Sequence, residues 1–378
     1  MYKPKIKIGI LGGGQLGQMW IQSAIGFDVE VHVLDPDNEA PCSHFCAKFV
    51  HGDYLDFDTV VNFGKDLDII TIEFENINVD ALFELQSLGV KVYPQPEVIK
   101  LIQDKGLQKQ FYTENNIATS EYVLVDNLED FASLDAEFFP VFQKARRGGY
   151  DGKGVVRLKS KNDLAKAFDV PSVLERQVDL EKEIGVIVAR SSTGEVKAFP
   201  PVDLVFNEKA NLVEFLYTPS QSSESVQDKA MKLALDLAAK LEIVGLLAVE
   251  MFVLKNGDVM VNEIAPRPHN SGHSTIEANV TSQFEQHLRA IIGLPLGDTA
   301  VIRPAVMINL LGAEGFSGEV KYEGIEDVLK VDGVHLHLYS KKITKPYRKM
   351  GHLNVTAVTL DEAIKKANNI KNLIQIKA

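Results

Sequence analysis

Two glutamates on either side of an Asn-Gly pair have a spacing that predicts a metal site. If Asn256 and Gly257 are the central residues of a two-residue hairpin turn, Glu250 lies directly opposite Glu263 on the facing strand. Opposed carboxylates about 5 Å apart destabilise a sheet unless one is protonated or a cation lies between them. The apolar run GLLAVEMFVL indicates a buried strand, so we favour a divalent metal over a solvated surface pair. A bulged three-residue turn would instead stagger the two acids by one residue.

The loop that follows Glu263 carries side chains suited to a small polar anion. Arg267, His269, Asn270 and Ser271 bring a guanidinium, an imidazole, an amide and a hydroxyl together between prolines and a glycine. A histidine of this loop could alternatively be a third metal ligand or a general base. We therefore expect an anion site beside the predicted metal.

A glycine-rich turn near the N-terminus predicts a phosphate site. The segment Gly12–Gly17 reads G-x-G-x-x-G between a strand and a helix, and Asp35 ends the next strand. This is the form of a dinucleotide-binding fingerprint. Its physical content is only that backbone amides at a helix N-terminus can approach an anion. We therefore favour a simpler phosphate site over NAD or FAD binding, with a purely structural turn as the other alternative.

A second glycine-rich segment predicts a hairpin loop that covers phosphates. Its glycines and cations are Lys144, Arg146, Arg147, Gly148, Gly149, Gly152, Lys153 and Gly154. The segment is not a Walker A loop, because the G-x-x-x-x-G-K-[ST] spacing is absent and a strand, VVRL, follows it. The alternative is a basic surface hairpin.

Three further polar groups lie in or after predicted strands. Glu175 and Glu183 could accept hydrogen bonds from an amino group and from ribose hydroxyls, although each alone reads as an ordinary surface acid. The basic residues Lys341, Lys345, Arg348 and Lys349 form either a phosphate pocket or a solvated loop.

The elements that must position these residues fall into three regions. Residues 1–96 alternate apolar strands with helical segments, the pattern of a parallel α/β sheet, which places function at the strand ends. Residues 97–304 contain a helix around LIQDKGLQKQF, then strands, glycine turns and an amphipathic helix. Residues 305–378 contain short strands and a last helix from Asp361, which predicts a small β-rich domain. The apolar stripe of the amphipathic helix is Val226, Ala230, Leu233, Ala234, Leu237, Ala238 and Leu241.

Composition limits the function. The chain has 378 residues with 52 acidic and 40 basic side chains, a formal charge of −12, which disfavours nonspecific binding to nucleic acid or anionic membranes. No apolar stretch approaches the roughly 20 residues that span a bilayer, and we expect a cytoplasmic protein. Cys42 and Cys46 lack the second ligand pair of a zinc site.

Taken together, the motifs resemble the ATP-grasp ligases, and within them the 5-(carboxyamino)imidazole ribonucleotide synthase family. The resemblance runs nearly end to end, through GGGQLGQM, TIEFEN, RRGGYDGKG, VNEIAPRPHNSGH and RKMGHLNV. It implies a Rossmann-like N-terminal domain that binds no nicotinamide, a central ATP-grasp domain and a small C-terminal domain, assembled as a homodimer. The implied reaction uses ATP, Mg²⁺ and bicarbonate to carboxylate 5-aminoimidazole ribonucleotide through carboxyphosphate, in purine biosynthesis.

The resemblance also assigns roles to individual residues. The metal ligands are Glu250 and Glu263. ATP contacts are Lys105, Lys144, Gly149, Gly152, Lys153, Gly154, Glu175, Gln177, Val178, Glu183, Asn262 and Glu263. Ribonucleotide contacts are Gln15, Leu16, Glu73, Tyr150, Asp151, Lys341 and Arg348. Catalytic residues are Arg267, His269, Asn270, Ser271, Lys341 and Asp151, with Asp151 or His269 handling the proton of the reacting amine. Phe206 stands where the family commonly has a histidine, which puts one nucleotide contact in doubt.

Three alternatives stay open at this point. A formate-dependent glycinamide ribonucleotide transformylase shares the ATP-grasp architecture and would differ in its product. An NAD-dependent oxidoreductase explains G-x-G-x-x-G but leaves the opposed acids and the second glycine loop without a role. A noncatalytic nucleotide-binding module would bind ATP without releasing phosphate.

Overall fold

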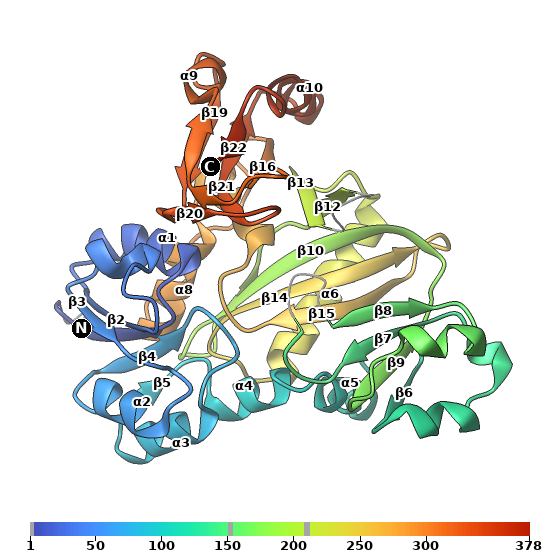
Figure 1. The fold of residues 1–378 in the computed structure, drawn as a ribbon. Helices are drawn as coiled ribbons and strands as arrows, with labels where there is room; N and C mark the ends of the chain where they lie inside the picture. The colour runs from blue at the N-terminus through green and yellow to red at the C-terminus, as the bar shows by residue number, and fades with distance from the viewer. Residues whose placement is uncertain (1–3, 150–153, 208–211) are drawn as a thin grey trace.

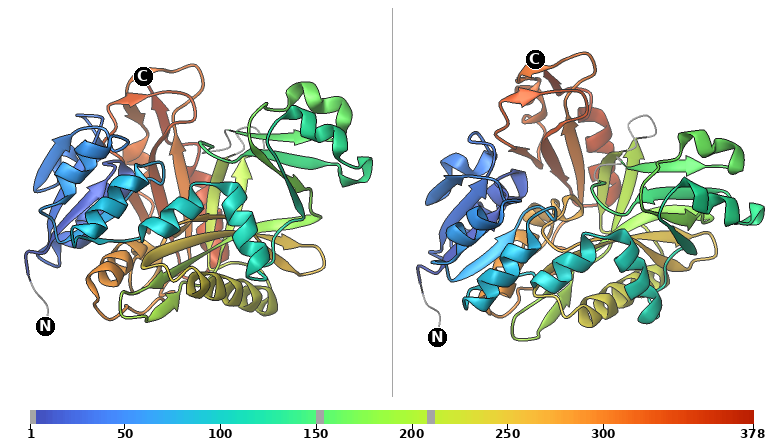
Figure 2. Two further views of the ribbon diagram at one scale, coloured as in Figure 1. Left: turned by 90° about the horizontal axis from the view of Figure 1, so that it is seen from below. Right: turned by 60° about the horizontal axis from the view of Figure 1, so that its bottom comes forward.

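Residues 4–149, 154–207 and 212–378 are described by the computed structural model of the chain, drawn in Figure 1. The N-terminal region in blue and the C-terminal strands in red lie beside the central region in green to yellow, and Figure 2 gives two further views. The predicted fold class is confirmed: an α/β N-terminal unit precedes a mixed α+β central unit and a small, mainly β C-terminal unit.

The N-terminal unit contains a five-stranded parallel sheet in the order β3-β2-β1-β4-β5 among the described residues. The strands are β1 (Lys7–Leu11), β2 (Glu30–Asp35), β3 (Lys48–His51), β4 (Ile69–Ile72) and β5 (Lys91–Val92). The helical segments are α1 (Gln15–Ile25), η1 (Pro41–His44), α2 (Phe57–Gly64) and α3 (Val79–Ser87). Because the strands are parallel, their carboxyl ends meet at one edge, which brings Gly12, Asp35 and Glu73 together.

Two helices, not one, follow this sheet. The expected single helix around LIQDKGLQKQF is wrong: α4 (Pro96–Ile102) ends before Asp104, and α5 (Lys105–Glu114) begins after it. The Asp104 carboxylate accepts hydrogen bonds from the amides of Gly106 and Leu107, at 2.8 and 3.2 Å. An aspartate cap of this kind starts a new helix because it satisfies otherwise unpaired amides. The break places Lys105 in the first turn of α5.

A four-stranded antiparallel sheet follows in the described part of the chain, in the order β6-β9-β7-β8. Its strands are β6 (Tyr122–Val125), β7 (Val141–Ala145), β8 (Val155–Leu158) and β9 (Ser172–Arg176), with 3-10 turns η2 (Leu128–Ser133), η3 (Ala136–Phe138) and η4 (Lys161–Lys166). β7 pairs with β8, so the second glycine segment joins two strands, as predicted.

The large sheet runs from the central unit into the C-terminal unit. Its path is β15-β14-β10-β12-β13-β16-β21-β19, with β11 paired to β10, among the described residues. Its strands are β10 (Leu180–Arg190), β11 (Val196–Ala198), β12 (Val202–Asn207), β13 (Leu212–Thr218), β14 (Gly245–Leu254), β15 (Val259–Ala265), β16 (Ala305–Leu311), β19 (Val334–Leu338) and β21 (Lys349–Thr356). Because β13 pairs with β16, the C-terminal strands β16, β21 and β19 belong to the same sheet as the central strands.

The amphipathic helix is confirmed as core. It is α6 (Glu224–Lys240), it begins after a Ser223 cap, and the buried members of its stripe pack against strands of the large sheet. The remaining elements are η5 (Asn270–Gly272), α7 (Thr275–Ala278), α8 (Gln283–Ile292), β17 (Gly318–Glu319), β18 (Lys321–Glu323), α9 (Ile325–Val328), β20 (Ile343–Thr344), α10 (Leu360–Ile370) and β22 (Gln375–Lys377). Within the described ranges, the helices lack the combination of length and apolar character needed to cross a membrane.

Candidate active site

A cavity of about 1270 Å³ lies where the N-terminal sheet, the two central sheets and the segment 341–349 meet. It is lined by these predicted site residues: Gln15, Leu16, Glu73, Lys105, Lys144, Gly149, Glu175, Gln177, Val178, Glu183, Glu250, Asn262, Glu263, Arg267, His269, Asn270, Ser271, Lys341 and Arg348. Gly154 does not line it but closes the β7–β8 hairpin, where its carbonyl accepts from the Ala145 amide at 2.9 Å. Tyr150, Asp151, Gly152 and Lys153 lie outside the described residues.

Glu250 on β14 pairs directly with Glu263 on β15, as predicted, but the turn and the strand register that produce this pairing differ from the expected ones. The turn has three residues, with Leu254 hydrogen-bonded to Asp258 around it, so the predicted two-residue turn is wrong. The longer turn shifts the pairing by one residue up to Met251 and Val261. A β-bulge at Asn262 then adds one residue to β15 and returns the two acids to direct opposition.

A third carboxylate, Glu183 on β10, joins the pair. Gly185 pairs with Glu250 across β10 and β14, and Glu183 lies two residues from Gly185, on the same face of the sheet. Burial, together with Glu263 and Glu183, raises the pKa of Glu250 to about 8. Burial and Glu263 also raise the pKa of Glu183 to about 7, although Lys144 opposes the rise. Carboxylates that repel one another in this way form a site that a cation stabilises.

Glu263 is held in its charged form by lysines. Its side chain is half exposed and lines the cavity. Desolvation alone would raise its pKa, but Lys105 and Lys144 outweigh that effect and the pKa lies below its usual range. Lys105 Nζ lies 2.6 Å from the Glu263 carboxylate. The opposed carboxylates of Glu250 and Glu263 are hard oxygen donors of the kind that Mg²⁺ takes in proteins, although no group of three or more possible metal ligands occurs among the described residues.

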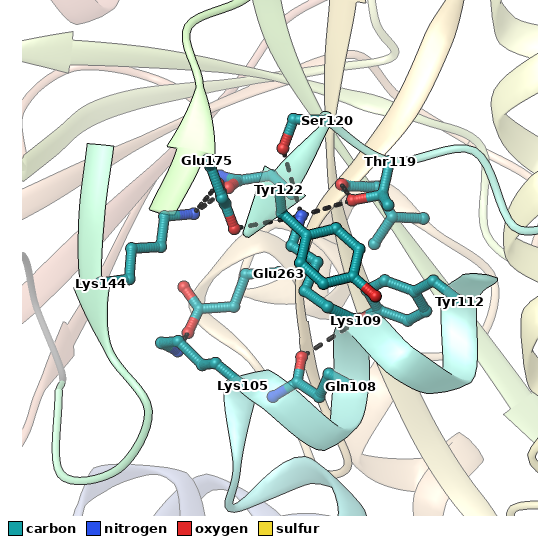
Figure 3. A network of polar contacts seen from close by, with 12 residues as sticks. Lys105, Gln108, Lys109, Tyr112, Thr119, Ser120, Tyr122, Lys144, Glu175 and Glu263 are labelled. Carbon is teal, nitrogen blue, oxygen red and sulfur yellow. Dashed lines mark hydrogen bonds and ion pairs between the residues drawn. The ribbon is translucent and has the colours of Figure 1, made fainter. Parts of the chain in front are cut away.

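Lysines also organise the wall next to the acids, as Figure 3 shows. Lys144 Nζ lies 2.8 Å from Glu175 Oε2 and donates to Asn262 Oδ1 at 2.8 Å. Lys109, absent from the sequence interpretation, lies 3.1 Å from the other oxygen of Glu175. Its position four residues after Lys105 on α5 was visible in the sequence, but its burial was not.

The Arg-His-Asn-Ser loop lies against the acidic pair. His269 Nε2 is 3.8 Å from Glu250, and its Nδ1 is 2.9 Å from the Ser271 hydroxyl. Arg267 forms an ion pair of 2.8 Å with Glu75, another residue that the sequence interpretation missed. The signal for Glu75 that the sequence contained was the second glutamate of the segment TIEFEN. The loop therefore places an imidazole and its hydroxyl partner beside Glu250 and a guanidinium in the same cavity, side chains that suit a small anion.

The N-terminal glycine turn is occupied by the chain's own carboxylates. The amides of Gly14 and Leu16 donate to Glu73, and the amide of Gly13 donates to Asp35 at 2.6 Å. Glu73 is buried, and desolvation raises its pKa despite these hydrogen bonds. A dinucleotide fingerprint would offer such amides to a pyrophosphate. Because Glu73 and Asp35 accept from these three amides, the amides are not offered to a phosphate of either a dinucleotide or a ribonucleotide in this structure.

The basic C-terminal segment faces this turn. A side hollow of about 230 Å³ is lined by Gly14 and Asp35 on one side and by Lys341, Lys342 and Arg348 on the other. Lys341 donates to the carbonyl of Lys349 at 2.8 Å, and Arg348 donates to that of Ile343 at 2.6 Å. The four basic residues Lys341, Lys345, Arg348 and Lys349 all line the main cavity. This position favours a phosphate pocket over a solvated loop.

Three family models match the chain in succession. The ribonucleotide synthetase preATP-grasp domain matches residues 5–103, the ATP-grasp domain matches residues 110–284, and the phosphoribosylaminoimidazole carboxylase C-terminal domain matches residues 305–366. Fold and site together define an ATP-grasp enzyme.

Individual relatives give the family. The N5-carboxyaminoimidazole ribonucleotide synthase of Bacillus subtilis is 37% identical, over 97% of this chain and 95% of that protein. The crystal structure of N5-carboxyaminoimidazole ribonucleotide synthetase from Thermotoga maritima has 41% identity and a TM-score of 0.90 over 99% of both chains. The enzyme from Aspergillus clavatus, in complex with ADP and 5-aminoimidazole ribonucleotide, has 32% identity and a TM-score of 0.89 over 98% of both chains.

The chain belongs to the N5-carboxyaminoimidazole ribonucleotide synthase family, which confirms the resemblance. Several curated relatives named phosphoribosylaminoimidazole carboxylase are longer, and the chain spans 64% to 69% of their length.

Proposed function

We propose that this chain carboxylates the exocyclic amine of 5-aminoimidazole ribonucleotide with bicarbonate, while ATP is converted to ADP and phosphate. The product is N5-carboxyaminoimidazole ribonucleotide, an intermediate of purine synthesis. The observation that carries the proposal is the direct opposition of Glu250 and Glu263 beside the Arg267–Ser271 loop. That arrangement supports a cation site next to an anion site within one cavity.

ATP is proposed to bind along the wall between the small and large sheets. Lys105, Lys144 and Asn262 face its phosphates, and Glu175, Gln177, Val178 and Glu183 line the nucleoside end. Of the loop residues that the resemblance assigns to ATP (Gly149, Gly152, Lys153 and Gly154), Gly149 lines this cavity. Lys144 bridges the two ends because it contacts both Glu175 and Asn262.

Glu250 and Glu263 are proposed to hold Mg²⁺, which neutralises charge on the transferring phosphoryl group when bound. The raised pKa of Glu250 supports this assignment, because a buried carboxylate facing two others is costly to ionise without a cation. Glu183 adds negative charge at the same face of the sheet.

In the first chemical step a bicarbonate oxygen attacks the γ-phosphorus of ATP, the bond from phosphorus to the bridging oxygen of ADP breaks, and carboxyphosphate forms. Arg267, His269, Asn270 and Ser271 are proposed to orient the bicarbonate. Charge stabilisation by a fixed guanidinium lowers the barrier because it needs no reorganisation.

In the second step the exocyclic amine of the ribonucleotide attacks the carboxyl carbon and phosphate leaves. Gln15, Leu16 and Glu73 are proposed to hold the ribonucleotide at the glycine turn. Lys341 and Arg348 are proposed to contact it from the opposite side, and the resemblance adds Tyr150 and Asp151 as further ribonucleotide contacts. Asp151 or His269 takes the proton that the amine loses.

Phosphate release tests the proposed function directly. With ATP, Mg²⁺ and bicarbonate, we expect release to rise when 5-aminoimidazole ribonucleotide is added, with formation of the carboxylated product. Formate in place of bicarbonate, with glycinamide ribonucleotide, is the control for the transformylase. Product formation only in the formate arm would contradict the proposal, and nucleotide binding without phosphate release would indicate a noncatalytic module.

The assembly and the domain limits are further proposals. We propose a cytoplasmic homodimer that acts on small molecules and binds neither nucleic acid nor membranes, with domains at 1–96, 97–304 and 305–378. Light scattering coupled to size exclusion tests the dimer, and limited proteolysis tests the boundaries.

A further inference from the structure

Lys109 is a buried cation to which the proposed reaction gives no role. It is 2% exposed and lies on α5, behind the cavity wall. Its ammonium group has three acceptors within reach: Thr119 Oγ1 at 2.6 Å, Ser120 Oγ at 3.2 Å and Glu175 Oε1 at 3.1 Å. Figure 3 shows Lys109 between these groups and Lys144 on the other side of Glu175. A lysine has three N–H donors, so these three acceptors provide one hydrogen-bond partner for each N–H of the buried ammonium group.

Glu175 is shared between two lysines of unequal exposure. Lys109 contacts one carboxylate oxygen and Lys144 contacts the other, at 2.8 Å. The side chain of Lys109 is 3% exposed, whereas that of Lys144 is 13% exposed and lines the cavity. A single lysine paired with Glu175 would form a neutral pair. The second lysine leaves this trio of residues with one net positive charge.

We propose that Lys109 is a positioning residue that neutralises Glu175 from behind, so that Glu175 offsets less of the positive charge that Lys144 presents to the nucleotide phosphates. The inference rests on the proposed ATP site, and it assigns Lys109 to the reaction through Glu175 and Lys144. Charges on largely buried side chains interact more strongly than charges in water, so the net charge of the trio affects phosphate affinity.

The electrostatic directions agree with this geometry. Desolvation lowers the pKa of Lys109, and Glu175 opposes that effect. Desolvation also acts against the charged form of Lys144, but Glu175 and Glu263 outweigh it and raise the pKa of Lys144. Desolvation would raise the pKa of Glu175, yet Lys144 and Lys109 together hold it below its usual range. Each lysine therefore favours the charged form of Glu175, and Glu175 favours the charged form of each lysine.

A second chain of contacts connects Lys109 to the strand of the acidic pair. The Thr119 hydroxyl accepts from Lys109 and donates to the carbonyl of Val261 at 3.0 Å, while the Val261 amide donates to Ala118 at 2.8 Å. Val261 directly precedes the bulge at Asn262, which in turn accepts from Lys144. Lys109 thus contacts the small sheet through Glu175 on β9. Through Thr119 it is also connected to the large sheet, at Val261 on β15.

A double-mutant cycle on ADP binding, measured by titration calorimetry without Mg²⁺, tests the proposal. We expect Lys109→Met to weaken ADP binding about tenfold, because Glu175 would then offset more of the positive charge of Lys144. In a Glu175→Gln background the same substitution should cost less than about threefold, because the carboxylate that it neutralises is gone. Lys109→Arg should keep affinity within about threefold of the wild type.

The controls separate charge from packing. Thr119→Val removes one hydroxyl from Lys109 without changing any charge, and we expect it to cost less than Lys109→Met. Circular dichroism and melting curves report whether each variant folds. If Lys109→Met does not fold, Lys109→Arg decides: loss of affinity above about tenfold in a folded Arg variant overturns the proposal.

Two other results would overturn it. One is wild-type ADP affinity in folded Lys109→Met, and the other is an equal cost of Lys109→Met in both backgrounds, which would indicate packing alone. A wild-type protein that binds no ADP would instead contradict the proposed function, so the two failures are distinguishable.

Discussion

Arg267, in the loop after β15, lies 2.8 Å from Glu75, which follows β4 of the N-terminal sheet. Both side chains are largely buried, and both line the cavity. Glu75 comes two residues after Glu73, whose carboxylate holds the glycine turn. One short segment of the N-terminal unit therefore orients both the proposed ribonucleotide turn and the proposed bicarbonate arginine.

The first prediction concerns this ion pair. Glu75→Gln should raise the KM for bicarbonate about tenfold, because Arg267 loses a charged partner that orients it. The Kd for ADP should stay within about twofold, since the side chain of Glu75 pairs with Arg267, a proposed bicarbonate residue. Steady-state kinetics and calorimetry measure the two quantities. Asp327→Asn, which breaks an exposed pair with Lys330, is the control and should change neither. Equal losses of bicarbonate and nucleotide affinity would mean that Glu75 acts on the fold as a whole.

The second prediction concerns the opposed acids. Glu263→Gln should lower kcat for ATP turnover at least about 100-fold, because one charged ligand of the proposed cation is lost. The fold should persist, since Glu263 is half exposed. Phosphate release and circular dichroism are the measurements. Asp258→Asn, at the exposed end of the same hairpin, should leave turnover unchanged. Near-wild-type turnover in Glu263→Gln would remove the metal assignment.

The third prediction is a pH dependence of stability without Mg²⁺ or nucleotide. The pKa of Glu250 is about 8 in the folded chain against 4.5 as its ordinary value. Between these values the folded state binds more protons than the unfolded state, so stability falls as the pH rises from about 5 to 8. The Glu250→Gln variant has no carboxylate at this position, so this pH-dependent fall in stability is absent from it. Melting temperatures of the variant should therefore exceed those of the wild type by a margin that grows with pH.

The comparison with the variant isolates Glu250 from other titrating groups. Burial lowers the pKa of His287 to about 3 and lowers those of His273 and His352, and these histidines add stability as the pH rises through the acidic range. They are common to both proteins and cancel in the difference. A margin that shrinks with pH would contradict the raised pKa of Glu250.

The fourth prediction concerns the glycine turn. A Cβ at Gly14 would lie 2.5 Å from Glu73 Oε1, closer than side chains tolerate. Gly14→Ala should therefore destabilise the protein by about 1–3 kcal/mol and raise the KM for the ribonucleotide. Gly26→Ala, after the other end of α1, is the matched control, because its Cβ would meet only one atom, at 3.7 Å. Calorimetric melting and steady-state kinetics measure both variants, and equal effects would show that crowding at Glu73 is not the cause.

Several features were predictable because they depend on local patterns. The stripe of α6 follows helical periodicity, and the alternation of strands and helices predicts the parallel sheet of the N-terminal unit. The Asn-Gly hairpin, with an acid on each strand, predicted the pairing of Glu250 with Glu263. The loop of Arg267, His269 and Ser271 lies beside Glu250 because it follows Glu263 in the chain.

Other features depend on contacts between distant segments. The sequence interpretation placed a two-residue turn where a three-residue turn and a bulge at Asn262 offset one another. The bulge is stabilised where Lys144, more than a hundred residues away in the chain, donates to Asn262. Local propensity cannot encode such a partner.

By itself, the sequence determined the family, the fold class and many of the polar side chains that line the cavity, because these follow from motifs and periodicity. Only the tertiary structure decided that Glu73 caps the glycine turn, that Glu75 holds Arg267 and that Lys109 is buried behind Glu175. Each of these is a charged side chain whose role is set by the partner that offsets its desolvation. That partner lies on another element, brought near only when the sheets assemble.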